Sequence, residues 1–150
     1  MEVRRDLSAC PRPGQGTAVT SGAYDGVHLG HRAVIAEVRR RADERGLATA
    51  VVTFDRHPAS VVRPESAPRL LTDLDQKLEL LAGCGVDYTL VVHFDEVRAK
   101  EAAADFVEEV LVTFAAQEAG SSITNIPFSK EGAIPVFGLD LGFSFDLGQH

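Results

Sequence analysis

The hydrophobic positions of this chain form two alternating kinds of pattern along its first 114 residues. Short apolar runs that predict buried strands span residues 17–20, 47–54 and 87–94, and the run 47–54 has no polar alternation at all. After each run, apolar residues recur at helical spacing. These positions are Ala33, Val34, Ile35, Val38 and Ala42, then Leu74, Leu78 and Leu81, and finally Ala103, Phe106, Val107, Val110, Leu111 and Phe114.

Residues that begin or end helices punctuate this pattern. Gly46 is expected to end the first helix, Thr72 to cap the start of the second with Asp75 three residues on, and the glycines at 83 and 85 to end it. Strand and helix therefore alternate, which predicts an α/β fold with a parallel sheet and helices on both faces. Ligands of such sheets gather at the carboxyl ends of the strands. At 150 residues, the chain is expected to form a single domain over 1–150.

The segment 22–31, Gly-Ala-Tyr-Asp-Gly-Val-His-Leu-Gly-His, lies where the first strand is expected to pass into the first helix. Backbone amides at a helix start have no intrahelical acceptor, and the helix dipole favours an anion there, so phosphate can dock. Gly26 and Gly30 lack the side chains that would block its approach. His28 and His31, three residues apart, are expected to share one side of the first turn and to donate hydrogen bonds to phosphate oxygens.

The histidine pair has two other interpretations besides a phosphate site. In the first, the histidines only cap the helix within a tight turn. In the second they bind zinc, which is the weaker interpretation because Cys10 and Cys84 are far from other candidate ligands and no C-x-x-C pattern occurs. The two cysteines are instead expected to be free thiols, and no residues are assigned to a metal.

Charge and hydropathy limit the partners that this chain is expected to bind. Its net charge of −7 argues against a nucleic-acid partner, because nucleic acids are bound by clustered Lys and Arg. The basic residues 39–41 and Arg45 are interpreted as a solvated helix face. No apolar run reaches membrane-spanning length, and residues 1–16 lack a secretory signal, so we expect a cytoplasmic protein without membrane contact.

Four stretches of the chain resemble the N-terminal FAD synthetase domain of the bacterial bifunctional riboflavin kinase/FMN adenylyltransferase family. The first is the segment 22–31, where the family usually has Phe in place of Tyr24. The others are residues 51–58 (Val-Val-Thr-Phe-Asp-Arg-His-Pro), residues 68–88 from Pro-Arg-Leu-Leu-Thr to Gly-Val-Asp-Tyr, and residues 94–112. They follow the family's order over roughly residues 16–113, which is more than a single motif match supplies.

The resemblance implies a Rossmann-like nucleotidyltransferase fold and an FMN adenylyltransferase activity. A phosphate oxygen of FMN would attack the α-phosphorus of ATP in line, giving FAD and pyrophosphate, with Mg²⁺ accompanying ATP. It implies catalytic roles for His28 and His31. Nucleotide binding falls to Gly22, Ala23, Tyr24, Asp25, Gly26 and Gly30, and flavin binding to His57 and Pro58.

Some of these assignments have structural alternatives. Asp25 belongs to the family's signature, but it would equally form an Asx-type turn before Gly26. The pair His57-Pro58 would be a strand-ending turn in any protein, because the residue before proline favours extended geometry.

Residues 115–150 depart from the family's pattern and are expected to form an irregular segment, rich in Gly, Ser and Pro, that packs on the sheet edge. No riboflavin kinase domain is expected in the 150 residues. Two alternatives to FMN adenylyltransferase activity therefore stay open: an inactive or incomplete nucleotide- or flavin-binding module, and a nucleotidyltransferase that uses the H-x-G-H site on another phosphorylated substrate. The sequence leaves the oligomeric state open.

Overall fold

A computed structural model describes residues 1–6, 17–101, 105, 109, 123–126 and 136–139. Its centre is a six-stranded sheet of order β1-β4-β3-β2-β6-β5. The strands in this order are β1 (Glu2–Arg4), β4 (Tyr88–Val92), β3 (Ala48–Phe54), β2 (Thr17–Ser21), β6 (Val136–Leu139) and β5 (Ile123–Ile126). The pairs β1–β4, β4–β3 and β3–β2 are parallel, whereas β2–β6 and β6–β5 are antiparallel. The α/β fold and the parallel sheet are thus confirmed.

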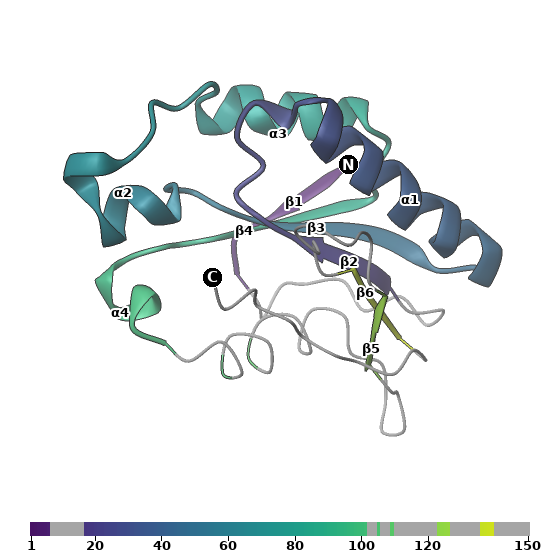
Figure 1. Cartoon of the computed structure of the whole chain (residues 1–150). Coiled ribbons are helices and arrows are strands. Elements are labelled where there is room, and N and C mark those ends of the chain that lie inside the picture. Colours follow the sequence, from purple (N-terminus) through teal and green to yellow (C-terminus); the bar gives the residue numbers. More distant parts are fainter. Residues whose placement is uncertain (7–16, 102–104, 106–108, 110–122, 127–135, 140–150) are drawn as a thin grey trace.

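The long helices α1 (Leu29–Arg45) and α3 (Leu74–Gly83) lie together on one face of the sheet (Figure 1). They form the crossover connections β2–α1–β3 and β3–α3–β4, and connections of the same hand place both helices on the same side. Shorter helices follow the strands at their carboxyl ends, namely the 3₁₀ turn η2 (Asp25–Val27), α2 (Pro58–Val62) with η3 (Pro64–Ser66), and α4 (Glu96–Ala99). The predicted third long helix, 103–114, lies almost wholly outside the described residues.

The buried core lies between the sheet and this helical layer. One cluster joins the loop after β2 to both long helices and comprises Tyr24, Val27, Ile35, Val51, Leu81 and Val86. A second cluster packs α1 on β2 and comprises Ala18, Val34, Val38 and Ala42. Of the five apolar positions predicted for the first helix, those at 34, 35, 38 and 42 are buried, so the helical spacing identified the correct face, but Ala33 is exposed.

The predicted boundaries need two corrections. Gly46 ends α1 as expected, with φ 65°, but the start of α3 is capped by Asp73 and not by Thr72. The Asp73 carboxylate accepts from the Gln76 amide and the Gln76 side chain accepts from the Asp73 amide, a complete capping box that Thr72 and Asp75 do not form. Thr72 is engaged elsewhere, because its hydroxyl donates to Asp25.

The second correction concerns residues 115–150, which were expected to be irregular throughout. Residues 123–126 and 136–139 form β5 and β6, and β6 pairs with the edge of the parallel sheet at β2. These two strands lie at a sheet edge, and there they continue the hydrogen-bond ladder. The short β1, which pairs with β4 at the opposite edge, was not predicted either.

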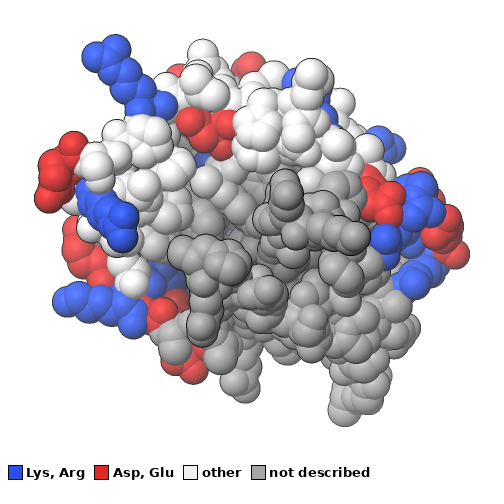
Figure 2. Space-filling view, viewed as in Figure 1, with Lys and Arg blue, Asp and Glu red and all other residues white. Residues whose placement is uncertain are grey.

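Two residues of the basic cluster, Arg40 and Arg41, are paired within α1, whereas Arg39 donates to the Cys84 carbonyl at 3.1 Å. Glu37 accepts hydrogen bonds from Arg40 and Arg41, and these bonds lower the pKa of its carboxyl to about 2. Arg40 also pairs with Glu44. Figure 2 shows positive and negative side chains beside one another at the margins of the face it displays. Among the described residues, no helix is long and apolar enough to cross a membrane.

Candidate functional site

A cavity of about 350 Å³ opens where β2 passes into α1. Its lining comes from the loop after β2, the first turn of α1 and two later loops, and comprises Ser21, Gly22, Ala23, Tyr24, Asp25, His28, His31, His57 and Leu71. Seven of the ten residues proposed from the sequence thus lie around one cavity. Gly26, Gly30 and Pro58 are not part of its lining.

His28 and His31 are stacked, with ring centroids 3.6 Å apart and planes inclined by 17°. The expectation that they share one side of the first turn is therefore confirmed. His28 is also the N-cap of α1, where its Nδ1 accepts from the His31 amide at 3.3 Å. Because an Nδ1 that accepts a hydrogen bond carries no proton, the proton of the neutral ring is on Nε2. Capping thus fixes a tautomer with an Nε2–H donor, and the interpretations as cap and as phosphate ligand are compatible.

His31 lies in a more enclosed environment than His28. Burial, and secondarily the neighbouring His28, hold its pKa below the ordinary value of 6.5, although Asp25 opposes the shift. Its Nδ1 is shielded from solvent and has no hydrogen-bond partner among the described residues. The ring is thus mainly neutral at pH 7 in the free protein. An anion bound beside His31 would raise the pKa of this ring and favour its protonated form.

Tyr24 contributes to the cavity differently from the sequence-based expectation. Its side chain is only 2% exposed, and its phenol shares a 2.6 Å hydrogen bond with the Thr20 hydroxyl in the core. Burial raises the pKa of this phenol, against the smaller opposing effect of the Thr20 bond. The backbone at Tyr24 and Val27 has positive φ, 51° and 39°, which L-residues rarely adopt. The loop is therefore held in a strained conformation by its surroundings.

Gly26 and Gly30 of the motif make room for protein neighbours. Gly26 has φ 76°, and a Cβ there would lie 2.8 Å from Cδ1 of Leu71. A Cβ on Gly30 would lie 3.1 Å from Cε1 of His28. Both absent side chains therefore allow the loop and the His28 ring to take their positions, which is an indirect contribution to the cavity.

Asp25 does not form the Asx-type turn that was considered for it. Its carboxylate accepts from the backbone amides of Leu71 and Thr72 at 2.9–3.0 Å and from the Thr72 hydroxyl at 3.1 Å. Thr72 in turn accepts from the Gly26 amide at 3.0 Å. Burial is the largest single influence on the pKa of Asp25 and acts to raise it. The hydrogen bonds from Leu71 and Thr72 together outweigh burial, so the net effect is a lowered pKa. Asp25 thus ties the motif loop to the segment before α3.

His57 and Pro58 begin α2 in the same manner in which His28 begins α1. The Nδ1 atom of His57 accepts from the Ala59 amide at 3.1 Å, and Pro58 occupies the first helical position, where no amide donor is needed. The backbone of His57 is extended, as expected before proline. His57 lines the same cavity as His28 and His31, so imidazoles from two parallel-strand ends face one space.

Lys77 was not assigned any role from the sequence, although the structure connects it to this site. It is 8% exposed, and its Nζ donates to the Ala23 carbonyl at 3.1 Å and to the Phe54 carbonyl at 2.8 Å. The sequence did carry a signal: Lys77 is three residues after Leu74 and four before Leu81, so it lies on the apolar face of its helix.

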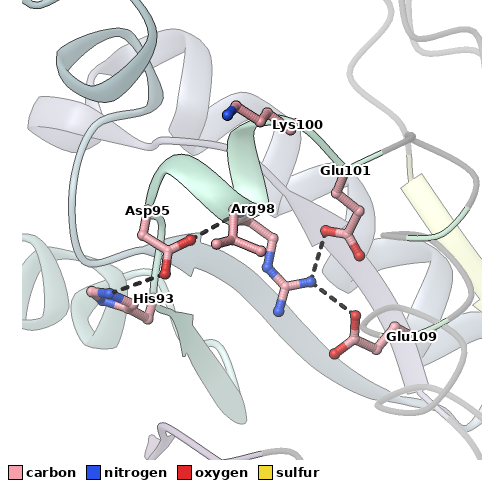
Figure 3. Close-up of a pocket in the computed structure, with 7 residues that line it drawn as sticks. His93, Asp95, Arg98, Lys100, Glu101 and Glu109 are labelled. Carbon is pink, nitrogen blue, oxygen red and sulfur yellow. Dashed lines mark hydrogen bonds and ion pairs between the residues drawn. The ribbon is translucent and has the colours of Figure 1, made fainter.

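A second, larger cavity of about 560 Å³ lies beside α4 and is lined by His93, Asp95, Val97, Arg98, Lys100, Glu101 and Glu109. Figure 3 shows the Arg98 guanidinium between Glu101 and Glu109, to which it donates at 2.8 and 3.0 Å. His93 pairs with Asp55 at 2.6 Å. Because carboxylates already balance the Arg98 charge, this cavity is less suited to an anion than the histidine-lined one.

No group of three or more His, Cys, Asp or Glu side chains in the described part of the chain has the arrangement of a metal site. Asp25 lines the histidine cavity, but both of its oxygens accept hydrogen bonds from Leu71. The described residues around the cavity therefore do not fit a metal ion held by the protein itself.

Four parallel strands, with a histidine-lined cavity at the start of the first long helix, form a Rossmann-type α/β fold of the kind that nucleotidyltransferases have. Comparison with known families matches residues 10–121 to FAD synthetase. The chain belongs to the FAD synthetase family.

Curated relatives agree with this family. Bifunctional riboflavin kinase/FMN adenylyltransferase of Escherichia coli (strain K12) is 40% identical over 107 residues, 71% of this chain and 34% of that protein. The protein of the same name from Pseudomonas fluorescens is 33% identical over 150 residues, all of this chain and 45% of that protein, so this alignment includes residues 115–150. That from Listeria monocytogenes is 42% identical over 92 residues, 61% of this chain and 29% of that protein. The chain thus spans between about a third and a half of the relatives' length.

Among solved structures, the crystal structure of a macrolide-efflux protein from Streptococcus pneumoniae has a similar fold, with a TM-score of 0.62 and 18% identity over 75% of this chain and 38% of that chain. At this identity the likeness concerns the fold alone.

Proposed function

We propose that this chain is an FMN adenylyltransferase domain that transfers AMP from ATP to FMN, giving FAD and pyrophosphate. The observation that carries the proposal is the cavity in which His28, His31 and His57 face one space at the carboxyl ends of β2 and β3. ATP and FMN are the proposed partners, and the net charge of −7 argues against a nucleic acid.

Phosphate recognition rests on donors that are in place before ligand arrives. The first turn of α1 offers backbone amides without intrahelical acceptors, and the dipole of this 17-residue helix favours an anion there. The His28 cap uses the His31 amide and holds the Nε2–H as a further donor. We assign these groups to the phosphates of ATP, with Gly22, Ala23, Tyr24 and Asp25 forming the wall and Gly26 and Gly30 allowing its shape.

In the reaction, a phosphate oxygen of FMN forms a bond to the α-phosphorus of ATP while the bond from that phosphorus to the bridging oxygen of pyrophosphate breaks. The protein positions the two reactants and stabilises charge on the oxygens around the α-phosphorus. The neutral His31 gains a proton more readily as negative charge builds up beside it, so it is suited to stabilising the transition state more than the ground state.

His57 and Pro58 are proposed to form the flavin side. Because His57 shares the cavity with His28, a flavin phosphate near His57 would lie beside the nucleotide phosphates. Pro58 restricts the backbone at the start of α2 and so fixes the direction of the His57 ring. Since the described cavity residues do not fit a metal held by the protein, we expect Mg²⁺ to arrive bound to the triphosphate.

The test is an assay of the purified chain with FMN, ATP and Mg²⁺, in which FAD is separated by chromatography and pyrophosphate is measured independently. FAD and pyrophosphate in equal amounts, both dependent on FMN, would support the proposal. Pyrophosphate formed only with another phosphorylated acceptor would favour a different nucleotidyltransferase. ATP binding by calorimetry without turnover of any acceptor would favour a binding module.

A further inference from the structure

Lys77 is buried at a position where a positive charge is unfavourable unless specific partners compensate it. It is 8% exposed and lies in the first turn of α3, where the helix dipole opposes positive charge. Burial lowers the pKa of Lys77, while the charges of Asp25 and Asp55 act in the opposite direction. A buried lysine without partners would be strongly destabilising, so its partners indicate what it does.

The partners are two backbone carbonyls at the carboxyl ends of neighbouring parallel strands. Nζ of Lys77 donates to the carbonyl of Phe54, the last residue of β3, and to that of Ala23, just after the end of β2. Ala23 also accepts from the Thr53 hydroxyl at 3.0 Å. One ammonium group therefore joins the two places where the chain leaves the sheet.

Each of these carbonyls stands directly before a segment that carries a cavity imidazole. Ala23 precedes Tyr24, the first of the two residues with positive φ, and this strained loop leads to His28. Phe54 precedes the segment 55–57, which ends at His57, the cap of α2. Lys77 itself does not line the histidine cavity, but it lines a neighbouring one of about 30 Å³ that His57 also borders.

We propose that Lys77 is a positioning residue that sets the separation of the His28 loop from the His57 turn, and thereby the relative placement of the two bound reactants. This role rests on the proposed function. It explains why a cation is buried on the apolar face of α3, where a leucine or methionine would pack at lower cost. Reactants in line are sensitive to such placement, since a displacement of about 1 Å can lower a rate about 100-fold.

The test compares Lys77→Met, which keeps the length of the side chain but removes its donors, with Leu81→Val. Leu81 is fully buried four residues further along the same helix, so its variant weakens packing while leaving both carbonyls bonded. The readouts are imidazole NMR signals, assigned with His28→Asn, the kcat and KM for FAD formation, and the melting temperature. Thr53→Val, which removes the other donor to Ala23, is the milder second variant if Lys77→Met does not fold.

In Lys77→Met we expect shifted His28 and His57 signals and a kcat lowered about 10- to 100-fold, with KM for ATP changed by less than about threefold. Leu81→Val should keep the signals and a kcat close to that of the parent. The proposal is overturned if Lys77→Met keeps the parent's signals, or if both variants shift them equally in proportion to lost stability. A parent chain that makes no FAD would count against the proposed function alone, because the NMR comparison still tests the positioning role.

Discussion

Replacing His28 by Asn and by Ala separates its role as a helix cap from its role as a phosphate donor. Asn is among the best N-cap residues and Ala among the poorest, whereas neither supplies the imidazole donor. The parent cap is long, 3.3 Å, so its loss costs about 0.5 kcal/mol, the low end for caps. Loss of the stacking with His31, at 3.6 Å between centroids, costs about another 0.5 kcal/mol.

His28→Ala should therefore be less stable than the parent by about 1 kcal/mol, which is about 3 °C in melting temperature for a chain of this size. His28→Asn recovers the cap but not the stacking with His31, so it should melt about halfway between the parent and His28→Ala. Both variants should lose turnover by about 100- to 1000-fold, as expected when one preorganised donor to a transition state is removed. Thermal unfolding followed by circular dichroism and the FAD assay measure the two effects separately.

Each unexpected result would contradict a different part of the role proposed for His28. If His28→Asn turns over within about tenfold of the parent, the imidazole acts only as a cap and the phosphate assignment is wrong. If His28→Asn is as unstable as His28→Ala, then the hydrogen bond to the His31 amide is not what stabilises the start of α1.

Three further results are expected. Gly26→Ala should lose about 1–2 kcal/mol in urea unfolding, because φ is 76° there and the new Cβ would lie 2.8 Å from Leu71; an unchanged midpoint would contradict this conformation. Asp25→Asn should lose about 1 kcal/mol at pH 7 after allowing for solvent screening. Since the Asp25 pKa is lowered, its contribution is present above the ordinary value of 3.8 and lost as pH falls through the folded pKa, so the variant should show a flatter acid limb. The His93 pKa, raised by its hydrogen bond to Asp55, should fall towards 6.5 in Asp55→Asn when followed by NMR, and an unchanged titration would exclude the pair in solution. Burial acts to raise the Asp55 pKa, but the hydrogen bonds from His93 and from the Phe94 amide outweigh it, so the pKa is lowered. The Asp55–His93 pair therefore stabilises the fold fully only between the ordinary pKa of Asp, 3.8, and that of His, 6.5.

The alternation of strands and long helices could be predicted because each element has an apolar pattern of its own. The spacing along α1 identified its four buried residues, although it also included the exposed Ala33. Gly46 marked the end of the helix through the positive φ that glycine tolerates. The cap of α3 was misplaced by one residue, because Thr72 and Asp73 are both good caps. Gln76, three residues after Asp73, completes a capping box that favours Asp73, and the long-range bond to Asp25 engages Thr72 elsewhere.

The sequence predicted which residues surround the candidate cavity better than it predicted what each of them contacts. The motif 22–31 indicated which residues surround the cavity, since a strand-to-helix turn gathers its own residues. Contacts between distant segments determined the rest: Asp25 holds Leu71, and Lys77 joins two strand ends. Asp25 and Leu71 are 46 residues apart, and Lys77 is 54 residues from Ala23 and 23 from Phe54. No periodicity of the sequence relates these partners.

The buried hydroxyl pair of Thr20 and Tyr24 couples two positions of the sequence that face different constraints. A phenylalanine at 24 would leave the threonine hydroxyl without this partner, and a valine at 20 would do the same to the phenol. Either single change carries the penalty of an unpaired buried polar group, about 1–3 kcal/mol, whereas both together are close to neutral. Among relatives, Phe in place of Tyr at position 24 should therefore be accompanied by a residue without a hydroxyl at position 20. Residue 20 should thus covary with residue 24 although it lies outside the motif 22–31.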